Sequence, residues 1–364
     1  MGLINVLVVD DSVVVRKIVT NVLGTDPALA VVGTAANGQI ALSKLLQVAP
    51  DVVTLDVEMP GMNGIETLRE IRRTHPRLPV IMFSTLTERG AASTLDALSA
   101  GASDYVCKPS NMGSVPEAVE AVRSQLIPKI KALCPGALGP LRPAPLRPAV
   151  PIRSAPGRPA ASGPVQVLAI GSSTGGPDAL TALLPSLPAD LAVPVVITQH
   201  MPPVFTRLFA QRLDGKCPLR VKEAENGDRV APGVVLIAPG DRHLTLKQSG
   251  DGVRVQLSDA PAENFCRPAV DVMFRSASAT YGAGVLAAVL TGMGSDGARG
   301  AEVVRRAGGE VLAQDQASSV VWGMPGAVVA AGQADHVLPL SRIAGELLQG
   351  VSRRRALTRT GALT

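Results

Sequence analysis

A proline-rich segment near the middle of the chain sets the strongest limit on what it can fold into. Residues 134–164 contain nine prolines, no acidic residue and no periodic apolar face. Proline lacks a backbone N–H and interrupts helices and sheets, so the segment favours an extended polyproline II conformation that rises about 3.1 Å per residue. Such a linker separates domains without orienting them. The chain of 364 residues is long enough for a folded domain with its own core on each side.

Short aliphatic runs alternate with helical stretches on both sides of this linker. Only eight residues are aromatic, so the cores must be built from Val, Leu, Ala and Ile. Unbroken aliphatic runs are typical of buried strands in parallel sheets, and their alternation with helices indicates β-α units. We therefore expect an α/β domain in each half. The predicted strands are residues 4–9, 30–34, 52–55, 79–83 and 105–107 before the linker, and 165–170, 195–198, 234–238 and 285–290 after it.

The net charge of +5 could indicate a nucleic-acid-binding protein. The excess lies in two segments that lack acidic residues, with four arginines in residues 134–164 and four in residues 352–364. Without those eight, 27 basic side chains remain against 30 acidic ones. A slightly acidic folded part without an obvious helix-turn-helix pair argues against a DNA-binding output domain. We expect no nucleic-acid partner.

The cysteines and the apolar runs indicate the compartment. The four cysteines are scattered without a Cys-x-x-Cys pair, which is typical neither of a disulfide framework nor of a zinc site. The chain begins directly in a predicted strand, and no apolar run approaches the ~18 residues of a membrane span. We therefore expect a soluble cytoplasmic protein that does not insert into membranes.

Acidic residues follow two of the predicted N-terminal strands. Asp10 and Asp11 come directly after the first strand, and Asp56 after the third. The carboxyl ends of neighbouring strands meet at one edge of a doubly wound sheet, where three carboxylates would repel one another unless a hard cation were bound. Oxygen ligands suit Mg²⁺. Ser84 and Lys108, at the ends of later strands, add the hydroxyl and ammonium groups that suit a bound phosphoryl group.

Together with Tyr105 and Pro109, these positions resemble the receiver family of two-component signalling over residues 3–122. The resemblance implies a flavodoxin-like fold, with a five-stranded parallel sheet in the order 2-1-3-4-5. It also implies that Asp56 is the phosphoacceptor. The implied magnesium ligands are Asp10, Asp11, Asp56 and the backbone carbonyl of Glu58, and the implied switch residues are Ser84, Tyr105 and Lys108. The alternative, that these acids are merely solvated, is disfavoured by five matching positions in order.

A glycine turn between a strand and a helix follows the linker. Residues 171–175 read GSSTG and fit the G-x-S-x-G pattern, which places Ser173 clear of the sheet. The free N–H groups of the following helix lie beside it and can receive negative charge. Ser173 is therefore the candidate nucleophile. The loop could instead cradle a phosphate, but it lacks the lysine of a P-loop.

A serine hydroxyl needs a neighbouring base, and this half of the chain offers His200, His243 and His336. His200 directly follows the strand PVVITQ, so it lies at the same sheet edge as Ser173. Asp296, in the loop TGMGSDG after an aliphatic strand, supplies a carboxylate at that edge. The order Ser, His, Asp differs from that of α/β hydrolases, so the serine motif does not imply their fold.

Five segments of this half resemble the CheB-type methylesterase domain over residues 161–351: GSSTGG, ITQHMP, NFCRPAVDVMF, TGMGSDG and QDQASSVVWGMP. The resemblance implies an α/β domain with a mostly parallel sheet. It makes Ser173 the nucleophile, His200 the base and Asp296 its orienting partner, with the backbone amide of Met293 in the oxyanion hole and Thr174 lining the site. Ser172 stands where the family pattern suggests alanine, and we expect it to pack or to make a turn hydrogen bond.

The two resemblances together imply a phosphorylation-activated hydrolase. It would remove methyl groups from glutamates of methyl-accepting chemotaxis receptors and deamidate receptor glutamines. The expected partners are those receptors and a chemotaxis histidine kinase; the expected cofactor is Mg²⁺ in the receiver, with none for ester hydrolysis. We expect a monomer that works at receptor clusters, with a helix end and linker at residues 123–160 and a basic tail at 352–364. A catalytically silent relay that only binds receptors is the alternative.

Overall fold

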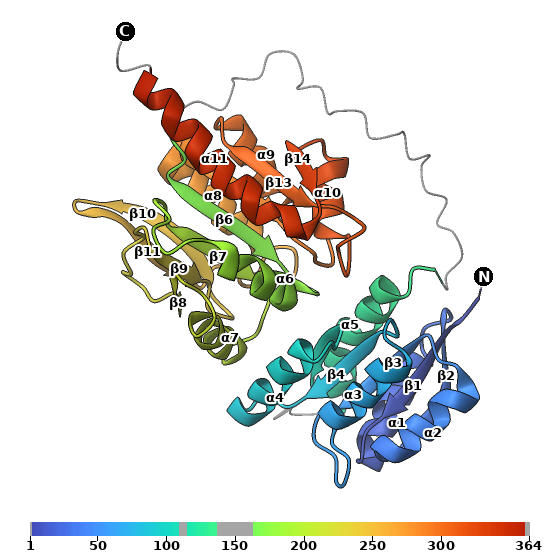
Figure 1. Ribbon diagram of the computed structural model, residues 1–364. Helices are drawn as coiled ribbons and strands as arrows, with labels where there is room; N and C mark the ends of the chain where they lie inside the picture. Colours follow the sequence, from blue (N-terminus) through green and yellow to red (C-terminus); the bar gives the residue numbers. More distant parts are fainter. Residues whose placement is uncertain (1, 109–114, 137–162, 361–364) are drawn as a thin grey trace. The chain divides into compact units, whose positions relative to one another are not determined.

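The computed structural model describes residues 2–108, 115–136 and 163–360. The chain divides into two compact units, residues 1–148 and 149–364 (Figure 1). Each unit is described by itself. The predicted linker falls at this division, and residues 137–160 of it lie outside the described residues.

The first unit is a five-stranded parallel sheet flanked by helices. Its strands are β1 (Ile4–Val9), β2 (Leu29–Ala35), β3 (Val52–Asp56), β4 (Val80–Ser84) and β5 (Asp104–Cys107). Its helices are α1 (Val13–Leu23), α2 (Gly38–Val48), α3 (Gly64–Thr74), α4 (Glu88–Ser99) and α5 (Val115–Leu133). The strand order is β2-β1-β3-β4-β5, and every neighbouring pair is parallel. This confirms the predicted flavodoxin-like topology.

The turns at the carboxyl edge of this sheet supply the caps of the helices that follow. Ser12, Asn37 and Thr87 each accept a hydrogen bond from a backbone N–H in the first turn of α1, α2 and α4. Asn63 and Glu66 form a reciprocal capping box at the start of α3. These side chains satisfy N–H groups that a helix cannot pair internally. The helix starts are therefore fixed directly beside the strand ends where the acidic residues lie.

Helix α5 continues well past residue 122 and belongs to the core of this unit. Leu126, Ile130 and Cys134 are buried in the same hydrophobic cluster as Val6 and Val8 of β1. The segment expected to contain a helix end thus contributes side chains to the core of the first unit as far as Cys134.

The second unit contains a seven-stranded parallel sheet. Its order is β14-β13-β12-β6-β7-β9-β8, with all neighbouring pairs parallel. The strands are β6 (Val167–Ser172), β7 (Val195–Gln199), β8 (Arg220–Glu223), β9 (Val234–Ile237), β12 (Val285–Val289), β13 (Glu310–Gln314) and β14 (His336–Leu338). A separate antiparallel hairpin consists of β10 (His243–Ser249) and β11 (Gly252–Ser258). The mostly parallel α/β fold is confirmed.

Helices cover both faces of this sheet (Figure 1). They are α6 (Gly176–Leu183), α7 (Phe205–Asp214), α8 (Val270–Tyr281), α9 (Ala298–Arg306), α10 (Met324–Ala330) and α11 (Leu340–Thr360). Helices α6 and α11 pack together on one face, whereas α8 contacts β6 and α9 on the other. Gly171 of β6 permits the close approach of α8, because a Cβ at that position would lie 2.4 Å from Val270 Cγ1.

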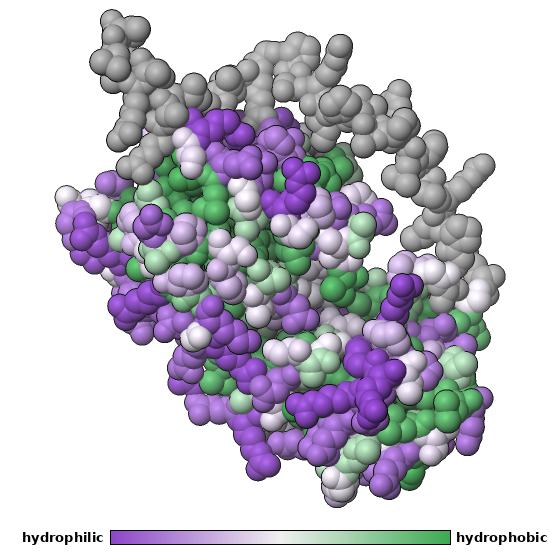
Figure 2. Space-filling model, viewed as in Figure 1, coloured by the Kyte–Doolittle hydropathy of each residue, from purple (hydrophilic) through white to green (hydrophobic). Residues whose placement is uncertain are grey.

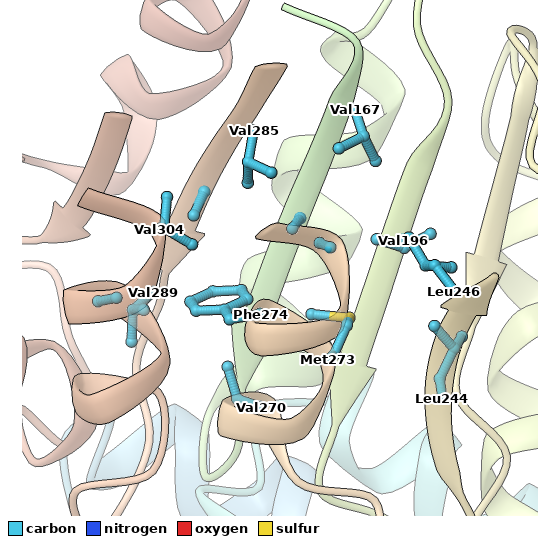
Figure 3. Close-up of a cluster of buried hydrophobic side chains, with 14 of the residues drawn as sticks. Val167, Val196, Leu244, Leu246, Val270, Met273, Phe274, Val285, Val289 and Val304 are labelled. Carbon is cyan, nitrogen blue, oxygen red and sulfur yellow. The ribbon is translucent and has the colours of Figure 1, made fainter. Parts of the chain in front are cut away.

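The main core lies between the sheet, helices α8 and α9, and the hairpin (Figure 3). Phe274 and Met273 of α8 point into this cluster, where they meet aliphatic side chains of β6, β7, β12 and β10. The valine and leucine members labelled in the figure are Val167, Val196, Leu244, Leu246, Val270, Val285, Val289 and Val304. This packing holds α8 and the loops at its start rigidly under the carboxyl edge of the sheet.

The C-terminal helix α11 includes part of the segment predicted as a basic tail. Arg354 is only 2% exposed, and its guanidinium donates hydrogen bonds to the carbonyl oxygens of Gly163 and Ala283. Arg353 pairs with Glu310 at 2.9 Å. The buried Arg354 therefore anchors α11 to the rest of the second unit, and Arg353 adds a partly exposed ion pair.

Polar and apolar residues are mixed on the surface. On the face shown in Figure 2, hydrophilic residues are interspersed with hydrophobic ones on both units. No helix in the described part of the chain combines the length and the apolar character that crossing a bilayer requires.

Candidate functional site

The predicted site residues lie at the switch points of the two sheets. In the first unit β1 lies between β2 and β3, so the connections from β1 and from β3 run in opposite directions along the sheet. In the second unit β6 lies between β7 and β12 in the same way. The loops at such points diverge and leave a crevice at the carboxyl edge, where ligands bind in open α/β sheets. Asp10 and Asp56 flank the first crevice, and Ser173 and Asp296 flank the second.

Ser173 and His200 are held side by side by strand register. Ser172, the last residue of β6, is paired with Gln199, the last residue of β7. The next residue on each strand is Ser173 and His200 respectively. The backbone continues the pairing, since His200 N–H donates to Ser172 O at 3.1 Å. The hydroxyl of Ser173 makes no hydrogen bond within the described part of the chain.

Gln199 ties these two strand ends together, a role that the sequence did not suggest. Its Nε2 donates to the carbonyl oxygens of Ser173 at 3.0 Å and His200 at 3.2 Å. Its Oε1 accepts the Ser172 hydroxyl at 2.7 Å. Gly176 leaves room for this amide, because a Cβ there would lie 2.0 Å from Gln199 Oε1. Ser172 is thus buried and makes a cross-strand hydrogen bond to a side chain that positions the candidate nucleophile and base.

The imidazole of His200 is held at both ring nitrogens. Nε2 lies 2.8 Å from Asp296 Oδ2, and Nδ1 lies 3.4 Å from Cys266 Sγ. Burial alone would lower the pKa of His200, but the hydrogen bonds with Asp296 and Cys266 outweigh it and raise the pKa to about 9. The structure therefore brings together the His and Asp predicted from sequence.

Asp296 is a buried carboxylate with an unusually full set of donors. Burial raises its pKa, yet the hydrogen bond with His200 and those from backbone N–H groups bring the pKa below its ordinary value. The backbone N–H of Val270 donates at 2.6 Å and that of Asp271 at 3.0 Å. Asn264 Nδ2 donates at 2.9 Å. A carboxylate with this many donors stays ionised and can hold an imidazolium.

Sequence reasoning missed the residues that support Asp296. Asn264 Nδ2 also donates to Asp271 Oδ2 at 3.0 Å, and Asp271 is itself 1% exposed. Asp271 Oδ1 accepts from the backbone N–H of Gly297 and Gly300 at 2.9 and 2.6 Å. The segment NFCRPAVDVMF contains these residues. Its polar positions, placed next to buried aliphatic ones, are the only signal that could have indicated them.

The loop that follows β12 lies directly against the nucleophile. A Cβ on Gly292 would fall 2.9 Å from Ser173 Cβ, and Ser173 N–H donates to Thr291 O at 3.0 Å. Thr291 Oγ1 in turn donates to Thr174 O at 2.9 Å. The backbone N–H of Met293, next to Gly292, donates to no residue of the described ranges. This N–H is thus free to donate to a ligand beside Ser173.

In the first unit the three predicted carboxylates converge. Oxygens of Asp10, Asp11 and Asp56 all lie within 4.8 Å of one another. Lys108 Nζ lies 3.0 Å from Asp10 Oδ2 and 2.8 Å from Asp56 Oδ2. Oxygen-only ligands of this charge and spacing fit a hard cation such as Mg²⁺. The structure thus brings these four residues together, and the roles expected of them from the sequence stay predictions.

Asp56 carries an unfavourable charge in this cluster. Burial and the neighbouring Asp10 carboxylate raise its pKa, Lys108 and the Glu58 N–H lower it, and the net result is a pKa of about 6. Glu58 N–H donates to Asp56 Oδ1 at 3.2 Å, while the Glu58 side chain is exposed and lies 3.7 Å from Arg89. The backbone of Glu58 is therefore at the site and its carboxylate is turned outward.

The remaining predicted receiver residues lie near this cluster. Ser84 is buried at the end of β4, and its hydroxyl donates to Gly90 O at 3.0 Å. Tyr105 is buried on β5 with Lys129 Nζ 5.1 Å from the centre of its ring. Lys129 also donates to Tyr105 O at 2.6 Å. Tyr105 lies on β5, which leads to Lys108, and Ser84 lies at the end of the neighbouring strand β4, where its carbonyl oxygen accepts from Lys108 N–H at 2.6 Å.

A further group with metal-ligand chemistry, Glu310, His336 and Glu346, lies in the second unit. Arg353 already pairs with both carboxylates, at 2.9 Å from Glu310 and 3.4 Å from Glu346. His336 lies 3.2 Å from Glu310. Arg353 contacts both carboxylates, and the group forms a partly exposed ionic contact between α11 and β13.

Comparison with known proteins matches both units. Residues 6–120 match the response regulator receiver domain family, and residues 168–347 match the CheB methylesterase family. A protein-glutamate methylesterase/protein-glutamine glutaminase of a Nocardioides species is 57% identical over 364 residues, covering 99% of both chains. Another, from Trichodesmium erythraeum, is 49% identical over 95% of this chain and 98% of its own. The crystal structure of the Thermotoga maritima CheB methylesterase catalytic domain aligns with a TM-score of 0.50 and 46% identity, covering 52% of this chain and 98% of that one.

Proposed function

Because this chain belongs to the CheB family of protein-glutamate methylesterases/protein-glutamine glutaminases with a receiver domain, we propose that Ser173, His200 and Asp296 carry out its chemistry. The activity of the family is demethylation and deamidation of chemotaxis receptors. The observation that most directly supports the assignment is the 2.8 Å hydrogen bond between His200 and Asp296 beside the free hydroxyl of Ser173.

The first half of the reaction forms an acyl-enzyme. Ser173 Oγ attacks the γ-carbonyl carbon of a methyl-glutamyl side chain while His200 accepts the hydroxyl proton. Nε2 is hydrogen-bonded to Asp296, so Nδ1 would accept this proton in place of its present contact with Cys266 Sγ. The N–H of Met293 donates to the developing oxyanion. The C–OCH₃ bond then breaks, and the methoxy oxygen takes the proton from His200 and leaves as methanol.

The second half restores the serine. A water molecule gives a proton to His200 and attacks the glutamyl carbonyl, the bond to Ser173 Oγ breaks, and the serine oxygen recovers the proton. The product is a receptor glutamate. A glutamine side chain follows the same path with ammonia as the leaving group. Asp296 stays ionised throughout and stabilises the protonated imidazole.

Phosphorylation of Asp56 is the proposed control. Asp10, Asp11, Asp56 and the backbone carbonyl of Glu58 would hold Mg²⁺, which neutralises charge on the incoming phosphoryl group. Lys108 and Ser84 would contact the phosphoryl oxygens, and Tyr105 would respond to that contact. A chemotaxis histidine kinase is the proposed phosphodonor. We place the protein, as a monomer in the cytoplasm, at clusters of its receptor substrates.

Methanol release from a methylated chemoreceptor tests this proposal. We expect release by the full chain to be faster with a small-molecule phosphodonor and Mg²⁺ than without. Ser173→Ala should abolish release while leaving phosphorylation of Asp56 intact. Ser249→Ala, on the exposed hairpin, is the matched control and should retain full activity.

Two results would overturn the assignment. Methanol release that survives Ser173→Ala would remove the nucleophile from the mechanism. A wild-type chain that binds methylated receptor but hydrolyses neither the receptor nor a methyl-glutamyl peptide would instead identify the second unit as a silent relay.

A further inference from the structure

A tight turn next to the catalytic groups carries an exposed aromatic side chain. Glu263 and Cys266 exchange both backbone hydrogen bonds, at 3.1 and 2.8 Å, so that Asn264 and Phe265 form a two-residue turn. Both turn residues have positive φ, 52° and 62°. This is the signature of a type I′ turn, in which asparagine is favoured at the first central position and glycine at the second. Asparagine fits here, and phenylalanine replaces the favoured glycine.

Phe265 is unfavourable in this turn on two counts. A bulky residue in the left-handed region is strained, at a cost on the order of 1 kcal/mol. Its ring is also 103% exposed, the largest value among the exposed apolar side chains of the described residues. No contact that the structure shows among the described residues compensates for either cost. Strain that persists at a rigid position next to an active site points to a function for the residue that bears it.

The turn is fixed to the catalytic groups on both sides of Phe265. Asn264 donates to Asp296 at 2.9 Å, and Cys266 Sγ lies 3.4 Å from His200 Nδ1. Glu263 forms an ion pair with Arg275 of α8. These contacts hold the turn that carries the aromatic ring in a fixed position next to the base and its orienting partner.

A second exposed apolar side chain lies on the nucleophile side. Val320 is 46% exposed. Its Cβ and Cγ2 would lie 2.7 Å from a Cβ at Gly175, two residues after Ser173. Phe265 lies between two residues that contact the base and its orienting partner, and Val320 lies beside the nucleophile loop, so exposed apolar side chains come from two loops that border the reacting groups. A surface of this kind suits a protein substrate that presents apolar side chains beside the reacting one.

We propose that Phe265, together with Val320, is a docking contact for the protein substrate and packs against apolar side chains that flank the methyl-glutamyl residue. This inference rests on the proposed function. It assigns Phe265 no part in the chemistry: the ring gains binding energy only from a substrate that extends beyond the ester group. Burial of a phenylalanine ring on docking corresponds to about a 10- to 100-fold gain in affinity.

Phe265→Gly separates docking from folding, because glycine is the residue that the turn favours. The variant should melt at the same temperature as the wild type or higher. With phosphorylated full-length enzyme and methylated chemoreceptor, kcat/KM should fall about 10-fold or more, mainly through KM. Hydrolysis of a small ester, the γ-methyl ester of N-acetylglutamate amide, should be unchanged. Val337→Ala, at an exposed apolar position on the edge strand β14, is the matched control and should change neither rate.

Three results would overturn the proposal. The first is an unchanged kcat/KM for the receptor, and the second is an equal fall for the receptor and the small ester, which would indicate a disturbed His200. The third is an effect confined to faster hydrolysis by the unphosphorylated chain, which would make Phe265 a contact of the chain's own receiver. In each case Ser173→Ala still reports on the proposed function independently, because it must abolish hydrolysis of both substrates.

Discussion

The two hydrogen bonds of His200 determine how the reaction should depend on pH. Its pKa is raised to about 9 by Asp296 and Cys266 against the opposing effect of burial. A general base acts in its neutral form, so most of the enzyme at neutral pH holds a protonated imidazole. The rate should therefore rise as the pH increases towards about 9.

Replacing Asp296 by asparagine should change both the size and the position of this profile. Asparagine cannot stabilise the imidazolium, so the pKa of His200 should fall and the rise in rate should move to lower pH. The maximal rate should drop by as much as ~10⁴, because the imidazole loses its orienting carboxylate. The measurement is kcat/KM for methanol release between about pH 6 and pH 10. Asp259→Asn, at an exposed ion pair with Arg242, serves as control. If the pH–rate profile of Asp296→Asn had the same midpoint as that of the wild type, the assignment would be contradicted.

Asp56 should destabilise the receiver when it is ionised. Its folded pKa of about 6 lies above the ordinary 3.8, so the penalty is fully present above pH 6 and disappears as the pH falls below 3.8. Near neutral pH and in the presence of a chelator, Asp56→Asn should therefore increase the free energy of unfolding by about 1–3 kcal/mol. The melting temperature should rise accordingly. The difference should shrink towards pH 4, and Mg²⁺ should stabilise the wild type more than the variant. Greater stability of the wild type without Mg²⁺ would refute this account.

Individual site residues were predictable where a strand fixes their position. Ser173, His200 and Asp56 each end or directly follow an aliphatic strand, and the parallel sheet brings such positions to one edge. Gln199 and Asn264 were missed because their roles depend on tertiary contacts. Gln199 is identified only by the register of β6 with β7, and Asn264 only by a left-handed turn that places its amide between two buried carboxylates.

At the scale of elements, the aliphatic strands that the sequence predicted agree with the structure to within a residue or two, but the buried internal strand β13 (EVLAQ) and the more polar strands were missed. The ranges of β1 and β3 in the structure are nearly those expected from sequence. Strand β8 reads RVKE and β14 reads HVL. Both lie at the edges of the sheet, where one side of the strand meets no other strand and the aliphatic signal is lost. The hairpin β10–β11 was missed for the same reason.

Helix α11 should depend on one buried arginine for its attachment. Arg354→Ala would leave the carbonyl oxygens of Gly163 and Ala283 without this donor and remove a buried side chain. We expect the second unit to lose about 2–4 kcal/mol of unfolding free energy, measured by denaturant titration. Arg353→Ala is the matched control, since Arg353 is half-exposed and its ion pairs are partly solvated. Equal stability of the two variants would show that Arg354 is not the anchor.

For the whole molecule, the proline-rich sequence of residues 134–164 predicts a linker that does not orient the domains, so we propose that control acts through docking of one domain on the other. Tethering raises the effective concentration to about millimolar, which favours even weak docking. Cleavage at a protease site inserted within residues 137–160 should therefore increase methanol release by the unphosphorylated protein. The cleaved and uncleaved forms are compared with and without phosphodonor. A separated second unit no faster than the intact unphosphorylated chain would exclude inhibition by docking.

The pairing of Ser172 with Gln199 also bears on which changes in chain length the enzyme can tolerate. Ser173 and His200 occupy the first position after two adjacent strands, so the distance between them is set by the spacing of β6 and β7 in the sheet. Residues gained or lost in the hairpin β10–β11 or in the linker leave that separation intact. A single residue inserted in β6 or β7 shifts one partner to the opposite face of the sheet. Length variation among homologous chains should therefore be concentrated in the former segments and excluded from the latter.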